Sequence, residues 1–507
     1  MKYKEKSIIG KLYYRLSLTA NEFLLLLLIA LFSFFLRFVN YSNRWGLAYD
    51  QARDGIVSHQ ILVNMEIPIS GPFSASGPFV FGPFWYWFHA LVTALNPHSV
   101  MWLWFVQTSI SALMPIVMFF IGRKIIDSRF GFIVAFFTAI STAQIAQSTN
   151  LTYSTFVGFI SVFILLFLGL FIKTKKTIYI FLMSLLMGLA VNVHFQAVGY
   201  FLFLPIILAL NIKSIKNIAF ISLGFSIPFI PLLLFDFASN HYQSNNIIEY
   251  LFNGGNTNSL PKRWLTYIGV FWPTSYAHII GGYMPFGALT AIISISVLLF
   301  FIWKKRIEKT IFIILVFLSL NFIVLRYFKG HIYDAFLVFL HPAILLITAW
   351  VVYKLIKFNK YLGIVFFLVI AIATLTKNYE EIVNATNHTA TYSMKMMQML
   401  EEKYPDKKFA VYDFQFKNSS KSNSLVLYLL KNDLISDNGQ KIGFLQATIS
   451  AELDMHNATV IHGAIRENPI LVDLGNYDRK QLESRDWEFV NPSAVYESVI
   501  HWYEKEN

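Results

Sequence analysis

The sequence predicts an all-α polytopic membrane protein that carries a small α/β domain at its C-terminal end. Three observations lead to this prediction. Hydrophobic residues make up 56% of the 507 positions and charged residues only 14%, which is more apolar surface than one soluble core could bury. Apolar runs near the length of a bilayer-crossing helix recur throughout residues 1–376. From residue 377 onward the pattern becomes that of a soluble domain.

About eleven apolar runs approach the roughly 20 residues that a helix needs to cross a bilayer. They fall at residues 20–40, 99–121, 130–148, 153–172, 177–195, 197–210, 217–235, 284–303, 309–326, 334–353 and 360–376. Several of these runs are short or adjoin one another. The predicted number of spans is therefore eleven to within about one or two.

The charges of the loops between these runs predict the orientation of the chain. If the N-terminus is cytoplasmic, the inner segments hold twenty Lys and Arg residues and the outer segments only seven. Short cytoplasmic loops collect basic residues, so we expect the N-terminus inside and the C-terminus outside. This orientation requires that residues 82–96 and 264–280 do not cross the membrane. Their aromatic content favours re-entrant or interfacial segments.

The net charge of +12 comes mostly from the inner loops, which face anionic lipid headgroups, and it does not predict a nucleic-acid partner. The absence of cysteine excludes disulfides and thiolate metal sites. Residues 377–507 instead hold 14 basic and 19 acidic side chains. Strand-like runs at 409–414, 458–465 and 469–475 alternate there with an expected helix at 422–431, which predicts a small α/β domain on the outer side.

Under this topology the unusual polar residues gather at one face of the membrane. Asp50, Arg53 and Asp54 lie in the first outer loop, residues 41–98 of the membrane domain 1–376. The other candidates lie at span ends and in later loops: Trp85, His194, Asp236, Lys262, Arg263, Arg326, Lys329, His331, Tyr333 and Asp334. Ionisable groups near the membrane are costly and often line a substrate path. The pattern indicates transport or transfer chemistry at the outer face.

Asp50 and Asp54 are four residues apart, so in a helix over residues 50–64 they would project from one face with Arg53 beside them. A carboxylate in this setting can take a proton from an acceptor hydroxyl, and a guanidinium can hold phosphate through two parallel hydrogen bonds. The alternative is a solvated loop helix whose charges only pair with one another. The residues also leave open a transporter or flippase, a polymerase or ligase that uses a diphosphate-linked oligosaccharide, and a divalent metal ion.

Four segments carry a family resemblance. They are YDQARD and the aromatic run that follows it (49–87), GLAVNVHFQAVGYFLFLP (188–205), PFIPLLLFDF (228–237) and GHIYDAFLVFLHP (330–342). In this order they resemble segments of the GT-C membrane glycosyltransferases that use polyprenyl-phosphate sugars, the superfamily of protein O-mannosyltransferases and aminoarabinose transferases, and especially their bacterial family 39 members.

In the relatives, an Asp-Glu pair opens the first outer loop and an arginine often follows. Asp50, Gln51 and Arg53 stand in these places. The chain departs from the family at Gln51, where glutamate is usual, and at Gly82, where several relatives have a phosphate-contacting lysine. It also departs at residues 335–336, which are Ala-Phe where relatives often have His-Tyr.

The resemblance implies inverting transfer of a sugar from a polyprenyl-phosphate donor to an acceptor hydroxyl, with Asp50 as base, Asp54 beside it in the catalytic centre and no cofactor required. The candidate cations for the donor phosphate are Arg53, Lys262, Arg263, Arg326 and Lys329, of which Lys262, Arg263 and Arg326 could instead contact lipid headgroups or the interface. The candidates for substrate binding are Trp85, His194, Asp236, His331, Tyr333 and Asp334. The alternatives are an interhelical hydrogen bond for His194, helix caps for Asp236 and Asp334, and interfacial anchors for Trp85 and Tyr333. The acceptor, whether protein, lipid or polysaccharide, is not specified. The implied location is the plasma (inner) membrane.

Overall fold

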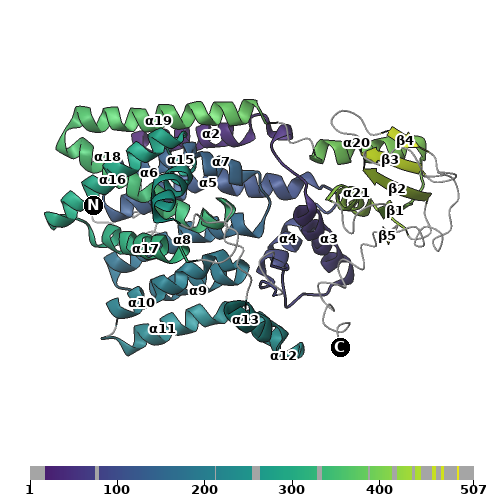
Figure 1. The fold of residues 1–507 in the computed structure, drawn as a ribbon, viewed down its shortest axis with the longest axis horizontal. Helices are drawn as coiled ribbons and strands as arrows, with labels where there is room; N and C mark the ends of the chain where they lie inside the picture. The colour runs from purple at the N-terminus through teal and green to yellow at the C-terminus, as the bar shows by residue number, and fades with distance from the viewer. Residues whose placement is uncertain are drawn as a thin grey trace, which may run out of the picture.

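A computed structural model gives the fold of the chain. The residues that it describes are 18–74, 79–211, 213–253, 263–327, 334–385, 389–413, 420–436, 440–446, 459–463, 470–472 and 488–489. A large helical part occupies most of the molecule, and a smaller part with a sheet lies at one end of it (Figure 1).

The eleven runs predicted as spans all form helices. In chain order these are α2 (Ala20–Phe38), α5 (Met101–Ile125), α6 (Ser128–Ile140) with α7 (Thr142–Ser148), α8 (Tyr153–Thr174), α9 (Thr177–Val193), η2 (Phe195–Gly199) with α10 (Tyr200–Leu210), α11 (Ile215–Ser226) with η3 (Ile227–Phe229) and α12 (Ile230–Ala238), α16 (Met284–Trp303), α17 (Lys309–Leu325), η5 (Asp334–Leu340) with α18 (His341–Phe358), and α19 (Lys360–Val383). Within the described residues, seven helical segments are long and apolar enough to cross a membrane, and the bent pair α6–α7 would make an eighth. Three more apolar segments, 177–193, 195–210 and 309–325, are shorter. The predicted multi-pass helical architecture is confirmed.

Small residues let these helices approach closely. A Cβ on Gly122 of α5 would lie 2.7 Å from the Cα of Gly131 in α6. A Cβ on Gly188 of α9 would lie 2.1 Å from the carbonyl oxygen of Phe225 in α11. Close backbone approach of this kind is how helices associate in lipid, where burying apolar side chains against a partner gains little over burying them in the bilayer.

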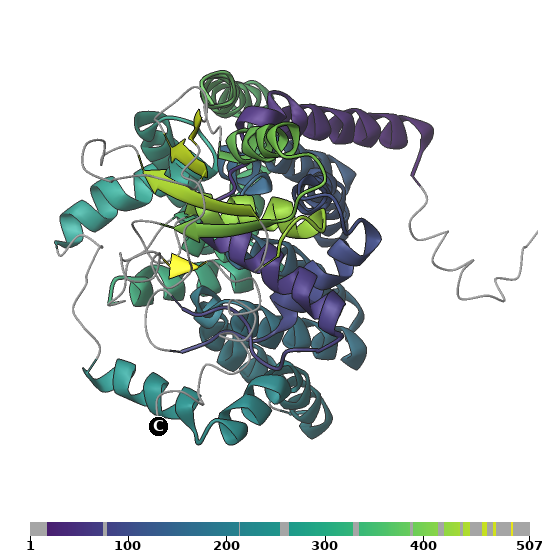
Figure 2. The same cartoon turned by 90° about the vertical axis from the view of Figure 1, so that its right-hand side faces the viewer.

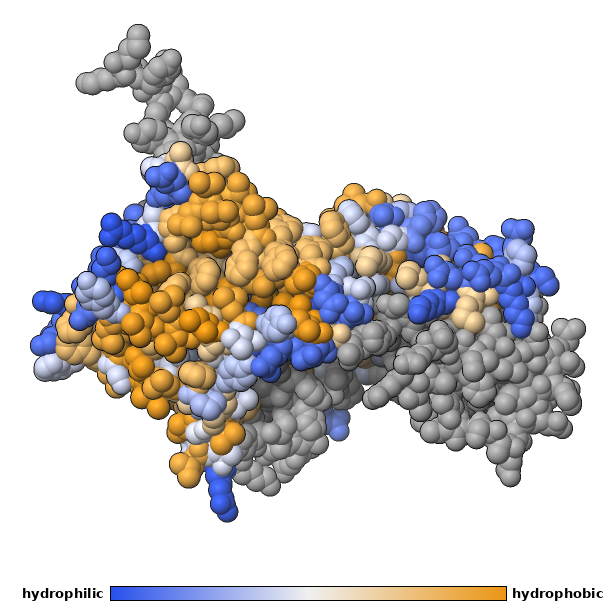
Figure 3. Space-filling model, turned by 90° about the horizontal axis from the view of Figure 1, so that it is seen from above, coloured by the Kyte–Doolittle hydropathy of each residue, from blue (hydrophilic) through white to orange (hydrophobic). Residues whose placement is uncertain are grey.

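The outward surface of the helical part is apolar. Figure 3 shows hydrophobic side chains over most of its visible face, with hydrophilic side chains at its end and on the C-terminal part. Leu31 and Phe35 of α2, among others, are more than half exposed. Exposed apolar surface of this extent is expected where lipid is the solvent.

The α6–α7 span is broken, with a bend of 55° at the break. The break separates three carbonyl groups from their usual partners one turn further on. Arg37, at the end of α2, donates from Nη1 to the carbonyl oxygen of Ala139 (3.0 Å) and from Nη2 to that of Thr138 (3.3 Å). Asn378 of α19 donates to the carbonyl oxygen of Ile140 (2.6 Å). Side chains from two other spans therefore satisfy the opened backbone.

The segments predicted not to cross are short helices. Residues 82–96 form α4 (Phe84–Leu95), whose twelve residues are too few to span a bilayer. Residues 264–280 form α14 (Trp264–Thr266), the π-helical turn η4 (Tyr267–Phe271) and α15 (Trp272–Ile279). Among the described residues before 384, the other helices outside the predicted spans are η1 (Tyr41–Asn43), α3 (Tyr49–Asn64) and α13 (Tyr242–Asn253).

The C-terminal part contains α20 (Thr389–Lys403), β1 (Phe409–Asp413), α21 (Ser420–Lys431), β2 (Gln440–Gln446), β3 (Thr459–Gly463), β4 (Ile470–Val472) and β5 (Glu488–Phe489). The strand order is β4-β3-β2-β1-β5, with β1, β2 and β3 parallel and both edge strands antiparallel to their neighbours. Figure 2 shows this sheet in front of the membrane helices. Within their described residues, the predicted strands at 409–414, 458–465 and 469–475 and the helix at 422–431 all form, whereas β2 and β5 were not predicted.

Candidate active site

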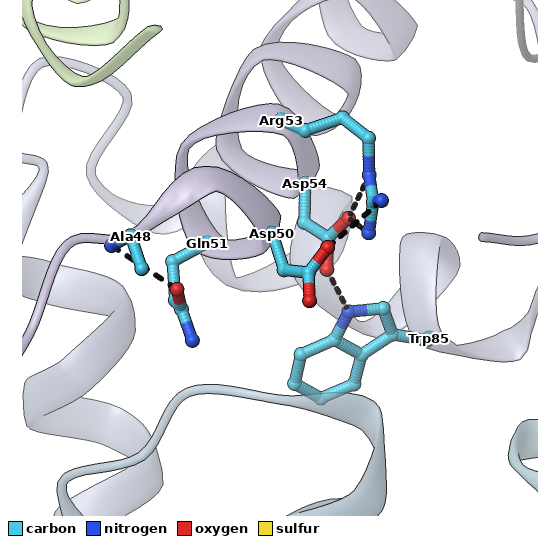
Figure 4. Close-up of polar contacts among 6 residues, drawn as sticks. All are labelled: Ala48, Asp50, Gln51, Arg53, Asp54 and Trp85. Atoms are coloured by element: carbon cyan, nitrogen blue, oxygen red, sulfur yellow. Dashed lines mark hydrogen bonds and ion pairs between the residues drawn. The ribbon is translucent and has the colours of Figure 1, made fainter. Parts of the chain in front are cut away.

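The first loop folds into a helix whose start is fixed by its own side chain. Gln51 accepts a hydrogen bond at Oε1 from the backbone N–H of Ala48 (3.1 Å), which satisfies one of the free donors at the start of α3. Figure 4 shows Gln51 on the opposite side of Asp50 from Arg53. Because α3 then runs without a break to Asn64, Asp50, Arg53 and Asp54 share one face, as the four-residue spacing predicts.

Arg53 joins the two carboxylates. Its Nη1 lies 3.0 Å from Oδ1 of Asp50, and its Nε and Nη2 donate to Oδ1 of Asp54 at 2.9 and 2.7 Å. The indole Nε1–H of Trp85, on α4, donates to the other oxygen of Asp54 at 2.7 Å (Figure 4). Asp54 therefore has donors on both oxygens, while the Asp50 side chain is 47% exposed and open to a ligand.

The charges of this cluster do not cancel, because two carboxylates share one guanidinium. Burial raises the pKa of the Asp54 carboxyl, the positive charge of Arg53 opposes that rise, and the negative charge of Asp50 adds to it. Asp50, in the first turn of α3, lies near the positive end of the helix dipole. The cluster thus holds one fully buried carboxylate and one accessible carboxylate in two distinct environments.

An aromatic wall connects these carboxylates to the end of α9. The ring of His194 stacks on Phe81 and Tyr153, with centroids 4.6 and 5.0 Å away, and Tyr153 in turn contacts Trp85 at 6.4 Å. The Nδ1 atom of His194 accepts from the backbone N–H of Gln196 (3.0 Å). The neutral ring therefore carries its proton on Nε2, which leaves that atom as a hydrogen-bond donor.

Gly82 joins the first loop to the same helix end. Its N–H donates to the carbonyl oxygen of Asn192 (2.8 Å), and a Cβ at this position would lie 1.4 Å from Oδ1 of Asn192. No side chain fits here unless Asn192 moves. A lysine at this position would therefore overlap Asn192.

Known proteins resemble this chain in fold and not in sequence. No protein-family model matches the chain, and no curated protein is similar to it in sequence. Among solved structures the chain is similar to ArnT from Cupriavidus metallidurans in the apo state, with 9% identity, a TM-score of 0.56, and coverage of 83% of this chain and 86% of ArnT. ArnT bound to undecaprenyl phosphate gives 12% identity, a TM-score of 0.54, and coverage of 84% and 86%. The apo oligosaccharyltransferase of Archaeoglobus fulgidus gives 13% identity, a TM-score of 0.51, and coverage of 81% and 64%.

The chain has the GT-C fold. This confirms the fold that the four sequence segments predicted. The sequence identity to these structures is only 9–13%, so the similarity lies in the fold. In this fold the first loop supplies α3 and α4, so the two carboxylates and Trp85 come from one continuous segment.

Of the other predicted site residues, His194 lies in the aromatic wall beside this segment. Asp236 is engaged elsewhere, since it accepts from the backbone N–H of Ser244 (2.9 Å) and from the Ser244 hydroxyl, and lies 3.6 Å from His241. Its carboxylate therefore ties α12 to the start of α13.

Two of the predicted cations, Arg263 and Arg326, lie near α14. Arg326 stands over the rings of Trp264 and Tyr267, at 5.5 and 5.8 Å, and Arg263 is exposed immediately before α14. Asp334 is the first residue of η5. Four predicted residues lie outside the described part of the chain: Lys262, Lys329, His331 and Tyr333.

Two residues of the site were not predicted. His89 of α4 is fully buried with its ring 4.1 Å from that of Trp85, and Tyr86 is fully buried beside Arg53. The four-residue spacing of Trp85 and His89 was the available signal, because it places both on one face of a helix. Among the described residues, no three His, Asp or Glu side chains gather in a way that would hold a metal ion.

Proposed function

We propose that this chain is a membrane glycosyltransferase that moves a sugar from a polyprenyl-phosphate donor to an acceptor hydroxyl. The observation that carries the proposal is Asp50, a half-exposed carboxylate bound to Arg53 next to the fully buried Asp54. The GT-C fold supports it, since ArnT has this fold and binds undecaprenyl phosphate.

In the proposed reaction Asp50 takes the proton of the acceptor hydroxyl. The hydroxyl oxygen attacks the anomeric carbon from the side opposite the phosphate, and the bond from that carbon to the phosphate oxygen breaks. The electron pair leaves with the polyprenyl phosphate, and the configuration of the sugar inverts. Phosphate leaves readily when cations stabilise its charge, so one base is enough and a second carboxylic acid is not needed.

Asp54 and Trp85 act in this proposal by holding Arg53 and thereby Asp50. The donor phosphate is bound by Arg53 together with cations of the later loops, for which the candidates are Lys262, Arg263, Arg326 and Lys329. The Nε2–H of His194 donates a hydrogen bond to the polyprenyl-phosphate sugar. The ends of the late spans complete the sugar site, with His331, Tyr333 and Asp334 as candidates. Asp236 has a supporting role because its carboxylate is engaged with Ser244.

We further propose that the site faces away from the cytoplasm of a plasma (inner) membrane. The basic inner loops support this orientation. Residues 1–376 would form the transferase domain and residues 377–507 an extracytoplasmic domain, and the acceptor would be a protein, lipid or polysaccharide of the cell envelope.

The test follows both halves of the reaction in membranes that contain the wild type or Asp50→Asn. Radiolabelled polyprenyl-phosphate sugars are supplied, and transferred sugar and released polyprenyl phosphate are both measured. We expect turnover with one donor class and a loss of about 10²–10⁴-fold in Asp50→Asn, which is the contribution of a positioned base.

The matched control is Asp406→Asn, which removes the same charge from an exposed site where φ is 61°, a conformation that Asn tolerates. It should keep wild-type turnover. Retained turnover in Asp50→Asn would exclude Asp50 as the base, and no turnover of any donor by the wild type would favour the transporter or the diphosphate-linked ligase.

A further inference from the structure

A helix of the C-terminal part packs against the helix that carries the carboxylates. In Figure 1, α21 lies next to α3, although more than 350 residues separate them in the sequence, and the two are in extensive contact. At about 100° per residue, Gly55 lies on the side of α3 turned away from Asp50 and Arg53. α21 therefore contacts the back of the helix whose front holds the candidate base.

The contact is closest at Gly55. A Cβ on this residue would lie 2.7 and 3.0 Å from the two terminal methyl carbons of Leu427, and Leu427 itself is fully buried. Glycine in the middle of a helix costs about 1 kcal/mol relative to alanine. The approach of α21 explains why the chain has glycine here in spite of that cost.

α21 also holds both ends of the first loop. The hydroxyl of Ser424 donates to the carbonyl oxygen of Leu47 (3.2 Å), just before α3. At the other end of α21, Nζ of Lys431 donates to the carbonyl oxygen of Pro97 (3.1 Å), just after α4. The backbone carbonyl oxygen of Lys431 lies 2.9 Å from Nδ1 of His98. One helix therefore contacts the segment from residue 47 to 98 at its start (Leu47), within α3 (Gly55) and at its end (Pro97 and His98).

We propose that α21 sets the position of α3, and that Gly55 and Leu427 are positioning residues for Asp50 and Arg53. The proposal rests on the proposed transferase function, because it concerns the placement of that reaction's base. The overlapping atoms are the methyl ends of the Leu427 side chain, but this side chain is fully buried and has little room to turn away. Because Trp85 lies in front of α3, we expect a group added between α3 and α21 to move the carboxylates relative to the aromatic wall. A misplacement of about 1 Å can cost about 100-fold in rate.

The test is a reciprocal rescue. Gly55→Ala adds a methyl group that overlaps Leu427, and we expect it to lower kcat by about 10–100-fold. Leu427→Ala removes the overlapping atoms, so the double variant should recover to within a few fold of Leu427→Ala alone. The matched control is Gly269→Ala, at a helical glycine whose Cβ would meet nothing within 4 Å, and it should keep wild-type kcat.

A second measurement does not depend on activity. The chain has no cysteine, so Leu47→Cys with Ser424→Cys gives one pair whose rate of disulfide formation reports the docking of α21. We expect ready formation in this background, slower formation when Gly55→Ala is added, and recovery when Leu427→Ala is added as well. If the wild type turned over no donor while these rates followed the expected order, the transferase function would fail but the docking would stand.

Two results would overturn the proposal. One is a loss of kcat in Gly55→Ala that Leu427→Ala does not rescue, with an unchanged rate of disulfide formation. The other is wild-type kcat in Gly55→Ala with slowed disulfide formation, because α21 could then move without disturbing the base.

Discussion

Two buried arginines lie near the start of the chain, and they differ in the partners that surround them. Arg37 is fully buried, and its described partners are all neutral: the carbonyl oxygens of the broken span, the carbonyl oxygen and hydroxyl of Ser33, and the hydroxyl of Ser111. Arg53 donates to two carboxylates, one buried and one 47% exposed. The surroundings of Arg37 are closed, and its guanidinium satisfies backbone carbonyl groups. The Arg53 cluster is accessible at Asp50, and accessible clusters of interacting charged groups are typical of functional sites.

The comparison predicts the largest effect on stability at Arg37. Arg37→Met leaves the carbonyl oxygens of Thr138 and Ala139 without donors inside the helical part, and each buried unsatisfied group costs about 1–3 kcal/mol. We expect a loss of about 3 kcal/mol or more in the free energy of unfolding. Thermal unfolding in detergent, with the exposed Arg306→Met as control, measures it. A variant as stable as the control would mean that other groups donate to the carbonyl oxygens of Thr138 and Ala139.

At Arg53 we expect the larger effect on turnover. Arg53→Lys keeps the charge but loses the planar fork that reaches Asp50 and Asp54 together, so kcat/KM should fall by about 10–100-fold. Arg37→Lys is the matched control, and its folded fraction should keep wild-type turnover. The reverse result, with turnover lost only in Arg37→Lys, would exchange the roles assigned to the two arginines.

A smaller effect distinguishes charged from neutral acceptors within the first loop. Trp85→Phe removes a donor from the buried Asp54 carboxylate, and a hydrogen bond to a charged group contributes about 1.5–3 kcal/mol. Trp87→Phe removes a similar donor from the neutral carbonyl oxygen of Pro68 (2.9 Å), where about 1 kcal/mol is expected. Equal losses in thermal unfolding would show that Asp54 is uncharged in the folded protein.

These two arginines also show what the sequence could predict. The apolar runs gave all eleven helical segments, and the spacing of Asp50 and Asp54 gave a shared face on α3, because both depend on local periodicity. The role of Arg37 was not predicted, since it depends on a bend in a span about 100 residues away. β2 was missed because QKIGFLQ has only a short apolar core between polar ends.

The same limit applies to the site. Family resemblance predicted Asp50 and Arg53. The structure places Trp85 against Asp54 and connects His194 to Trp85 through the ring of Tyr153. Nothing local in the sequence links Gly55 to Leu427, because that contact joins two parts of the chain with different compositions. Long-range packing of this kind can be seen only in the three-dimensional structure.

Lys431 is a third buried cation, and it extends the comparison because a lysine can lose its proton where an arginine does not. Burial lowers its pKa from 10.5 to about 8. The titratable groups near it are His59, His89 and His98, and Asp433 acts on His59. Between these two pKa values the unfolded chain binds more protons than the folded one, so stability should rise with pH from about 8 to about 10. Below about pH 8 the full cost of burying the charge remains.

The unfolding temperature, measured from about pH 8 to about pH 10, tests this rise in stability. Lys431→Met should remove the rise, and the exposed Lys407→Met should leave it intact. A rise that persists in Lys431→Met would show that another group causes it.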